Sequence, residues 1–362
     1  MVITQKVTSL AYSIHDGLAR KEEELTPLQR RHAVYKMPNS LEFFSYVFHF
    51  QALMAGPVIF YSDYMDFIYG KSAKSLTGCH EKKSSHEDDI VLEPSPVLIV
   101  MKKICVSVMC ALVFVTFIPM YPIQILKDDE FIEGTSNLYK VWYLLVVTML
   151  VRFKYYHAWI FADAICNNSG LGFNGYDEKG NARWDLVSNV DGFGFETALS
   201  LRDAIDSWNL GTNRWLRSIA YERAGPNKML FTYALSAIWH GFYPGYYLTF
   251  ASGAFFTVAG RSVRRHVRPY FLGSRRAKFF YDVLTMLTTR IVLAYFTFSF
   301  ILLEFIPSIR LLLKTYLLPH LLALVAIYVL PKISKLPSKS SSNNGTPHNC
   351  DQRSNGNSLK TD

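Results

Sequence analysis

The stretch TMLTTRIVLAYFTFSFILLEFIPSIRLLLKTYLLPHLLALVAIYVL, residues 285–330, decides the fold class of this chain. It contains two long apolar runs that are separated near Glu304 and Pro307. A bilayer core about 30 Å thick is crossed by roughly 20 helical residues, so each run is long enough to cross. We interpret the stretch as a helical hairpin in a membrane, with its turn near Pro307.

Working outward from this hairpin, the same kind of apolar run recurs along the chain. Half of the 362 residues are hydrophobic, which is too apolar for an ordinary soluble enzyme. The candidate spans are 41–60, 104–122, 138–162, 229–258, 283–306 and 311–330. We expect an all-α, polytopic membrane helical bundle over residues 1–330, followed by a disordered basic and polar tail over 331–362.

The net charge of +9 lies next to the spans and not on a separate basic domain. Residues 261–278 carry seven Lys and Arg between two spans, and the tail begins with PKISKLPSK. Two spans separate these basic segments, so both face one side, which the positive-inside rule makes cytosolic. We therefore expect no nucleic-acid partner. A secondary role in attracting anionic groups stays open.

Several motifs that would indicate a cofactor or a metal lack the surrounding sequence that such sites require. Residues 170–175, GLGFNG, match G-x-G-x-x-G but follow no strand and lie in no βαβ pattern. The five cysteines show no metal spacing. We expect no metal and no bound cofactor. The surrounding glycine-rich segment, 163–207, is typical of a loop that lines a site.

His240 is the first residue that indicates chemistry. It lies in SAIWHGFYPGYYLTF, residues 236–250, about 16 Å into a span that starts near Met229. An ionisable group at such depth is expensive and is usually held toward a cavity or a polar partner. Gly241 and Pro244 break the helix just beyond it, and irregular backbone at that depth lines a buried or watery cavity. A purely structural histidine is the alternative.

A second polar cluster lies upstream in DSWNLGTNRWLRSIAYERAGPNK, residues 206–228. It is too polar to cross a membrane, so we expect an amphipathic helix at the interface. Tryptophans at headgroup level and arginines that reach water would explain it as an anchor. Asn209 does not fit that explanation, because an uncharged amide adds little to an anchor.

Together these clusters resemble the membrane-bound O-acyltransferase (MBOAT) family. The matching positions are Trp208-Asn209, Thr212 and Trp215-Leu216, then Ser236-x-x-Trp239-His240-Gly241-x-x-Pro244-Gly245-Tyr246. The branch that acylates lysophosphatidylethanolamine (lyso-PE) and lysophosphatidylserine (lyso-PS) is the most similar. The resemblance also includes QKVTSLAYSIHDG, MAGPVIFYSDY, EPSP, FKYYHAWIFADAICNNSGLGFNGYDEKGNARWDLVSN and YERAG, and covers about residues 4–330.

The resemblance implies a bundle with interfacial and re-entrant helices around a central tunnel. Members of the family carry further N-terminal membrane helices before the segment that corresponds to QKVTSL, and this chain starts just before it. We expect the chain to be N-terminally incomplete, as a fragment, a short isoform or the product of a misplaced gene start.

The family's two functional positions match Asn209 and His240, which implies acyl transfer from acyl-CoA to a hydroxyl. His240 would take the proton of the lysophospholipid hydroxyl as a general base. Asn209 would stabilise the oxyanion or orient the acceptor, and these two roles stay open. No covalent nucleophile is required, although Ser236 lies one turn before His240, and Cys166 is a weaker candidate still.

Further residues are substrate-binding candidates. The cationic ones, which would bind CoA phosphates or simply anchor the chain at the interface, are Arg214, Arg217, Arg223 and Lys228. The aromatic ones, which would line the acyl or CoA path or merely pack, are Trp208, Tyr221, Trp239, Phe242, Tyr246 and Tyr247.

Three other functions stay open at this stage. An MBOAT enzyme for a protein or sterol acceptor would share the Asn/His pair. A transporter could also place a histidine beside a broken helix. An inactive truncated membrane protein would act only as a partner. The resemblance favours lysophospholipid and acyl-CoA, an oleoyl-type chain, and the endoplasmic reticulum membrane, and it leaves the oligomeric state open.

Overall fold

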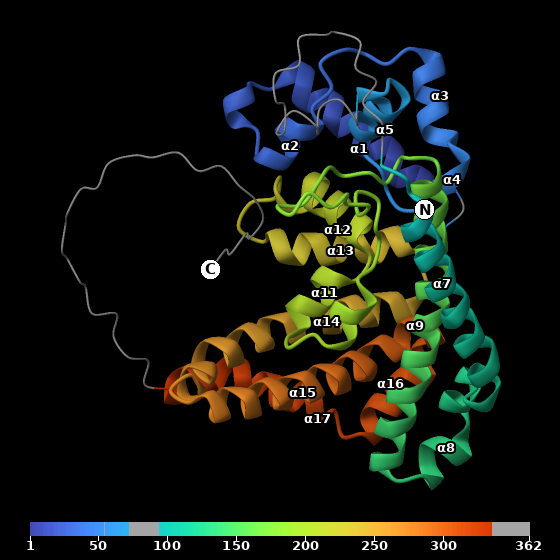
Figure 1. Ribbon diagram of the computed structural model, residues 1–362. Coiled ribbons are helices and arrows are strands. Elements are labelled where there is room, and N and C mark those ends of the chain that lie inside the picture. The colour runs from blue at the N-terminus through green and yellow to red at the C-terminus, as the bar shows by residue number, and fades with distance from the viewer. Residues whose placement is uncertain (54, 72–93, 335–362) are drawn as a thin grey trace.

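A computed structural model describes residues 1–53, 55–71 and 94–334, and this part of the chain is helical (Figure 1). Within these ranges no strand forms, and one isolated antiparallel bridge joins Tyr176 to Ala182. The all-α prediction is confirmed. Most of the tail predicted for 331–362 lies outside the described residues, as does most of the connection between α5 and α7.

The helices follow one another along the chain in three groups. The first group contains α1 (Val2–Ala19), η1 (Glu22–Glu24), α2 (Pro27–His32), α3 (Ser40–Phe48), α4 (Phe50–Leu53) and α5 (Tyr61–Ile68). The second contains α7 (Val97–Phe117), η2 (Ile118–Met120), η3 (Ile123–Lys127), α8 (Asp129–Gly134), α9 (Asn137–Asn168), α10 (Gly192–Glu196), α11 (Leu201–Ser207), α12 (Leu210–Leu216) and the π-helix η4 (Arg217–Tyr221). The third contains α13 (Lys228–His240), α14 (Pro244–His266), η5 (Arg268–Phe271), α15 (Arg275–Leu302), α16 (Phe305–Lys314), α17 (Leu318–Leu324), the π-helix η6 (Val325–Val329) and α18 (Leu330–Ile333).

Three helices in the described part of the chain are long and apolar enough to cross a membrane: Val97–Met120, Asn137–Asn168 and Arg275–Leu302. A fourth crossing is possible by length where Phe305–Lys314 and Leu318–Ile333 form a pair bent by 74°. The first arm of the predicted hairpin is therefore a continuous helix, α15, but its second arm is broken. Its turn comes just before Pro307, where Leu303 adopts a left-handed conformation (φ 67°).

Three of the six predicted spans are wrong as single helices, and one of them is 311–330, which is broken between α16 and α17. In 41–60, α3 ends at Phe48, and only the four-residue α4 follows before the chain runs extended into α5. The predicted span 229–258 is divided into α13 and α14 at Gly241, whose φ is 115°. Pro244 then starts α14 at a position where its missing N–H costs nothing. Hydropathy counts apolar residues and does not register such a reversal of the backbone.

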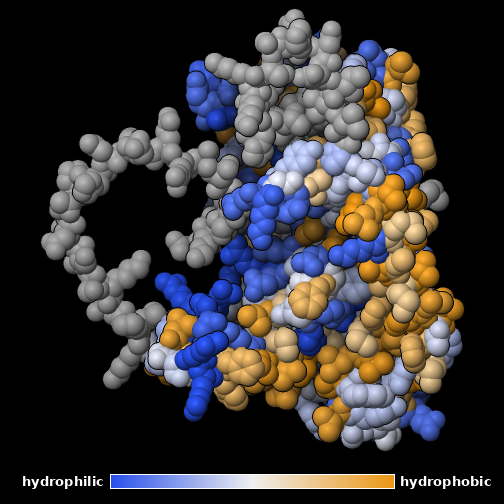
Figure 2. Space-filling view, in the orientation of Figure 1, coloured by the Kyte–Doolittle hydropathy of each residue, from blue (hydrophilic) through white to orange (hydrophobic). Residues whose placement is uncertain are grey.

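Long helices connect the two ends of the molecule. In Figure 1, α1–α5 lie at one end, α14–α17 lie toward the other, α13 lies between them below α12, and α7 packs along α9 at the side. The main core joins α9, α14 and α15 through buried residues such as Val147, Phe256 and Phe298. Figure 2 shows an apolar surface over α7, of whose spanning window only 17% is buried. It also shows a hydrophilic tip where α14 meets α15, the site of the predicted basic segment.

Helix α1 lies alongside α12 and η4 with a constant register. Gln5 donates to Thr212 (2.9 Å), Trp215 donates to Thr8 (3.0 Å), and Arg223 donates to Asp16 (2.8 Å). Each pair is separated by 207 residues in the sequence, so the two segments run parallel. The N-terminal helix thus supports the segment that follows Asn209.

Candidate active site

His240 is the last residue of α13 and lies directly before the backbone reversal at Gly241. Three aromatic rings from the next two helices surround its imidazole. The ring centroids of Phe300, Phe250 and Tyr246 lie 4.9, 5.1 and 5.5 Å from that of His240. The predicted helix break beyond His240 is confirmed. The imidazole of His240 is therefore half-buried among aromatic rings, at a point where the helix ends.

Asn209 precedes α12 and has a left-handed backbone, with φ 49° and ψ 54°. Its carbonyl oxygen accepts a hydrogen bond from the Asn213 amide (2.9 Å). The Asn213 side chain donates to the carbonyls of Ile205 and Trp208, at 2.6 and 2.9 Å. Non-glycine residues rarely adopt this conformation, and asparagine tolerates it better than most. We call residues 208–211 the Asn209 corner.

The glycine-rich segment predicted to line the site does contact the Asn209 corner. The Asn189 carbonyl accepts from the Leu210 amide (2.8 Å), and its side-chain Oδ1 accepts from the Gly211 amide (2.9 Å). Sequence reasoning assigned no role to Asn189. Its contacts join positions about twenty residues apart through a loop, and no local spacing reveals them.

Trp208 and His240 belong to two separate aromatic clusters. The Trp208 ring contacts Trp159 (4.9 Å), Phe195 (5.0 Å) and Tyr155 (5.8 Å). These rings come from α9 and α10, whereas the rings of Tyr246, Phe250 and Phe300 around His240 come from α14 and α15.

A partly buried ionic cluster beside Trp208 was not foreseen. Glu196 accepts hydrogen bonds from Arg152 Nε (2.7 Å) and Nη2 (2.9 Å), from Arg290 Nη1 (3.2 Å) and from the Tyr156 hydroxyl (2.7 Å). Arg152 lies on α9 and Arg290 on α15, both spanning helices, so the cluster fixes α10 between them. Arginines inside apolar helices signal such an arrangement, because charges there need partners.

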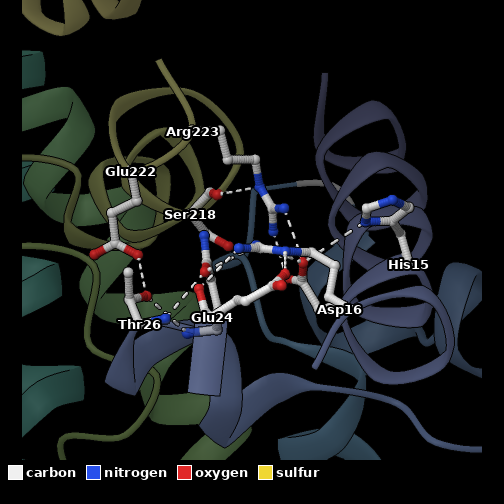
Figure 3. Close-up of polar contacts among 9 residues, drawn as sticks. His15, Asp16, Glu24, Thr26, Ser218, Glu222 and Arg223 are labelled. Carbon is white, nitrogen blue, oxygen red and sulfur yellow. Dashed lines mark hydrogen bonds and ion pairs between the residues drawn. The ribbon is translucent and has the colours of Figure 1, made fainter. Parts of the chain in front are cut away.

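The three arginine candidates have protein partners. Arg214 Nη1 donates to the Leu186 carbonyl (3.1 Å), and Arg217 Nε pairs with Glu222 (2.8 Å). Arg223 pairs with Asp16 and also donates to the Ser218 carbonyl (2.8 Å), as Figure 3 shows. Their role toward CoA phosphates stays a prediction. Any phosphate there would compete with these contacts.

The segment 206–228 is not one continuous amphipathic helix, which corrects the sequence interpretation. It forms the end of α11, then α12 and η4, and its buried face includes Thr212, Trp215 and Leu216. Trp215 is 2% exposed and donates to Thr8, so it is no headgroup anchor. Polar side chains that bind α1 made this segment look interfacial.

The remaining candidates are distributed over the same helices. Trp239 packs against Trp215, with ring centroids 5.7 Å apart, and Lys228 lies over the ring of Tyr221 (4.6 Å). Ser236 is buried one turn before His240. Cys166 is fully buried in an apolar cluster with Leu10, Tyr46 and Leu171, which gives it a packing role. Phe242 is 86% exposed and Tyr247 38% exposed, so neither is enclosed within the described residues.

A profile described as "MBOAT, membrane-bound O-acyltransferase family" matches residues 1–301, which include both Asn209 and His240. The chain belongs to this family. It is thus a multi-pass membrane protein, and the resemblance inferred from the sequence motifs is confirmed.

Three relatives indicate where this MBOAT chain lies within the family. It is 52% identical over 347 residues to "Lysophospholipid acyltransferase 6" of Drosophila melanogaster, covering 95% of this chain and 48% of the relative. It is 42% identical to "Membrane-bound glycerophospholipid O-acyltransferase 2" of Rattus norvegicus, covering 94% and 65%. It is 36% identical to "Lysophospholipid acyltransferase" of Schizosaccharomyces pombe, covering 94% and 67%. The chain therefore spans about half to two thirds of these relatives' length.

Proposed function

We propose that this MBOAT chain carries a lysophospholipid O-acyltransferase activity. Acyl-CoA is the donor, lyso-PE or lyso-PS is the preferred acceptor, and the endoplasmic reticulum membrane is the location. The observation that carries the proposal is the match over nearly the whole chain to relatives named as lysophospholipid or glycerophospholipid acyltransferases.

The chemistry assigns two successive proton transfers to His240. Its imidazole accepts the proton of the free glycerol hydroxyl, because a neutral imidazole is a base suited to neutral pH. The hydroxyl oxygen then attacks the thioester carbonyl, the new C–O bond forms, and the C–S bond breaks. CoA leaves as a thiolate and takes up the proton from the imidazolium. Atoms and charges balance without a covalent enzyme intermediate or a metal.

Asn209 stabilises the oxyanion of the thioester carbonyl in this scheme. Its amide Nδ2 donates to the oxygen that becomes negative as the tetrahedral intermediate forms. Removing one such donor costs about 10²- to 10³-fold in kcat. The aromatic rings around His240 keep water away from the thioester, which favours transfer to the lipid over hydrolysis.

Microsomes that contain this chain, labelled oleoyl-CoA and a panel of lysophospholipids test the proposal. We expect turnover that is highest with lyso-PE or lyso-PS and that collapses in His240→Ala and Asn209→Ala at unchanged expression. His15→Ala, at an exposed position on α1, and Asn174→Ala, whose half-buried side chain donates to Asp185, are matched controls that retain the parent rate.

A second preparation supplies the part of the Drosophila relative that the match does not cover. Turnover that appears only in this preparation would show that the chain needs the additional segment. Absence of lysophospholipid turnover in both preparations contradicts the proposal, and sterol and peptide acceptors would then be tested in its place.

A further inference from the structure

Asn189 contacts the Asn209 corner with both its backbone and its side chain. It is 5% exposed and lies in the loop between α9 and α10. The amides of Leu210 and Gly211 are the first two of α12, and such amides have no partner within their own helix. The Asn189 carbonyl and Oδ1 satisfy one each. One residue thus fixes the start of α12 directly after Asn209.

The same loop holds the chain on both sides of Asn209. Before the corner, the Asp191 amide donates to the Ser207 carbonyl (3.0 Å). After it, Arg214 donates to the Leu186 carbonyl (3.1 Å). With the two Asn189 contacts between them, the loop sets the position of the backbone from Ser207 to Arg214.

Gly211 allows this approach. A Cβ atom at this position would lie 2.9 Å from Asn189 Oδ1 and 3.0 Å from the Val58 amide nitrogen. Both distances are shorter than ordinary carbon contacts. The side chain of Asn189 therefore lies as close to the α12 backbone as a glycine permits.

The loop is itself anchored to two spanning helices. Lys103 of α7 donates to Asp163 of α9 (2.7 Å) and to the Trp184 carbonyl (2.8 Å). The Ser188 hydroxyl donates to the same Asp163 carboxylate (2.7 Å). Ser188 precedes Asn189 directly, so Asn189 is held between a largely buried ion pair and the Asn209 corner.

We propose that Asn189 is a positioning residue for acyl transfer, because it holds Asn209 in the left-handed conformation that fixes where the Asn209 amide points. The inference rests on the proposed function. Asn189 does not touch the reacting atoms in this scheme, and its whole effect on the reaction passes through Asn209.

The kinetic test uses Asn189→Ala, Asn189→Asp and the control Asn174→Ala. Misplacement of a reacting group by about 1 Å costs on the order of 10²-fold. We expect kcat of Asn189→Ala to fall about 10- to 100-fold, with KM for both substrates unchanged. Asn189→Asp keeps the acceptor for the Gly211 amide and restores most of kcat. A rise in KM at unchanged kcat would overturn the proposal.

A double-mutant cycle separates positioning from a general structural role. If Asn189 acts through Asn209, Asn189→Ala lowers the residual rate no further when Asn209 is already alanine. The same fold loss on both backgrounds would mean that Asn189 acts independently, and the proposal would be wrong.

Hydrogen–deuterium exchange decides the same point without turnover. In the parent, a peptide that covers residues 208–216 is protected. Asn189→Ala raises the exchange of the Gly211 amide within it at least about ten-fold, because this amide loses its acceptor, while Asn174→Ala does not. Unchanged exchange in Asn189→Ala overturns the proposal even if the parent proves inactive. An inactive parent with raised exchange would leave the Asn189 contacts established, and it would contradict the proposed function only if the preparation with the additional segment were inactive as well.

Discussion

At the scale of single residues, His240 and Asn209 share one property: each lies where the backbone changes direction. His240 ends α13 before Gly241, and Asn209 starts α12 in a left-handed conformation. Residues at such positions point their side chains away from the regular faces of a helix. Sparsely populated backbone conformations persist only where the surroundings fix them, and they cluster at functional sites.

Gly241 is the residue where this property can be tested. Its φ of 115° and ψ of −164° lie in a region that only glycine adopts readily. We expect Gly241→Ala to cost about 1–3 kcal/mol of stability, and to lower acyl transfer because the His240 end of α13 shifts. Thermal unfolding in detergent and the microsomal assay measure the two effects.

Gly260 in α14 provides the matched control. A Cβ there meets nothing within 4 Å. Because alanine suits a helix interior better than glycine, Gly260→Ala should stabilise the protein by about 0.5–1 kcal/mol and leave activity intact. Equal effects of the two substitutions would show that the conformation of Gly241 does not matter.

Sequence reasoning could find His240 but not what holds Asn209. The histidine is evident because an ionisable residue in an apolar run demands an explanation. Asn209 was chosen through the family resemblance, and its left-handed backbone was not expected. Asn189 was beyond reach, because its role depends on a loop that folds back onto α12.

At the scale of elements, the contact between α1 and η4 depends on a buried ion pair. Arg223 binds both carboxylate oxygens of Asp16, whose side chain is 2% exposed (Figure 3). Arg20 lies beside the same carboxylate, and the Thr26 hydroxyl donates to Glu222 (2.5 Å). The pair thus joins the N-terminal helices to the π-helix that follows α12.

Removing one partner of this pair should lower the free energy of unfolding. Asp16→Asn leaves the Arg223 charge buried without its counter-ion, and breaking such a pair costs about 3–5 kcal/mol. The control is Asp282→Asn, which removes an exposed pair with Lys278 and should cost about 0.3–0.5 kcal/mol. Urea unfolding in micelles, followed by tryptophan fluorescence, compares them. A similar midpoint for both variants would contradict a supporting role for the pair.

A pH effect is expected at the end of α3. The Lys6 amine is buried and donates to the Tyr46 and Val47 carbonyls, at 3.0 and 3.3 Å, and contacts His49 Nδ1 (2.7 Å). Burial lowers the pKa of Lys6 from 10.5 to about 8. Between these values the unfolded chain binds more protons than the folded one, so stability rises as pH increases from about 8 to 10.5.

Lys6→Met should abolish this contribution. The measurement is the unfolding temperature of parent and variant from pH 7 to pH 11. The unfolding temperature of the parent should rise relative to that of the variant between pH 8 and pH 10.5. Parallel curves would show that Lys6 has the same pKa in both states.

The elements themselves were only partly predictable. Composition fixed the helical class and most of the long apolar helices, because a bilayer demands them. The breaks at Phe48, Gly241 and Thr315 were harder, since a window of apolar residues looks alike whether or not its backbone is continuous. Segment 206–228 was misinterpreted as one amphipathic helix, because polar side chains that bind another helix have the same sequence pattern as those that face water.

At the scale of the whole molecule, the basic tip between α14 and α15 sets the orientation. Arginines at 261, 264, 265, 275 and 276 are exposed there. Because the positive-inside rule places such clusters in the cytosol, and α15 crosses the membrane, its two ends must face opposite sides.

Cysteine labelling checks this orientation. In a background with the native cysteines replaced by serine, an impermeant maleimide should label Gly273→Cys in sealed microsomes. It should label Phe305→Cys only after permeabilisation, because that position lies beyond the other end of α15. Labelling of both positions in sealed vesicles would exclude a crossing by α15.

The parallel register of α1 with α12 and η4 has a consequence for biosynthesis. The three hydrogen-bonded pairs join residues that are 207 positions apart. At about 5–20 residues per second, the ribosome needs roughly 10–40 s to make the partners of α1 after α1 itself has emerged. During that interval Gln5, Thr8 and Asp16 lack their native partners Thr212, Trp215 and Arg223, so a chaperone or the translocation machinery has its longest opportunity to bind this helix.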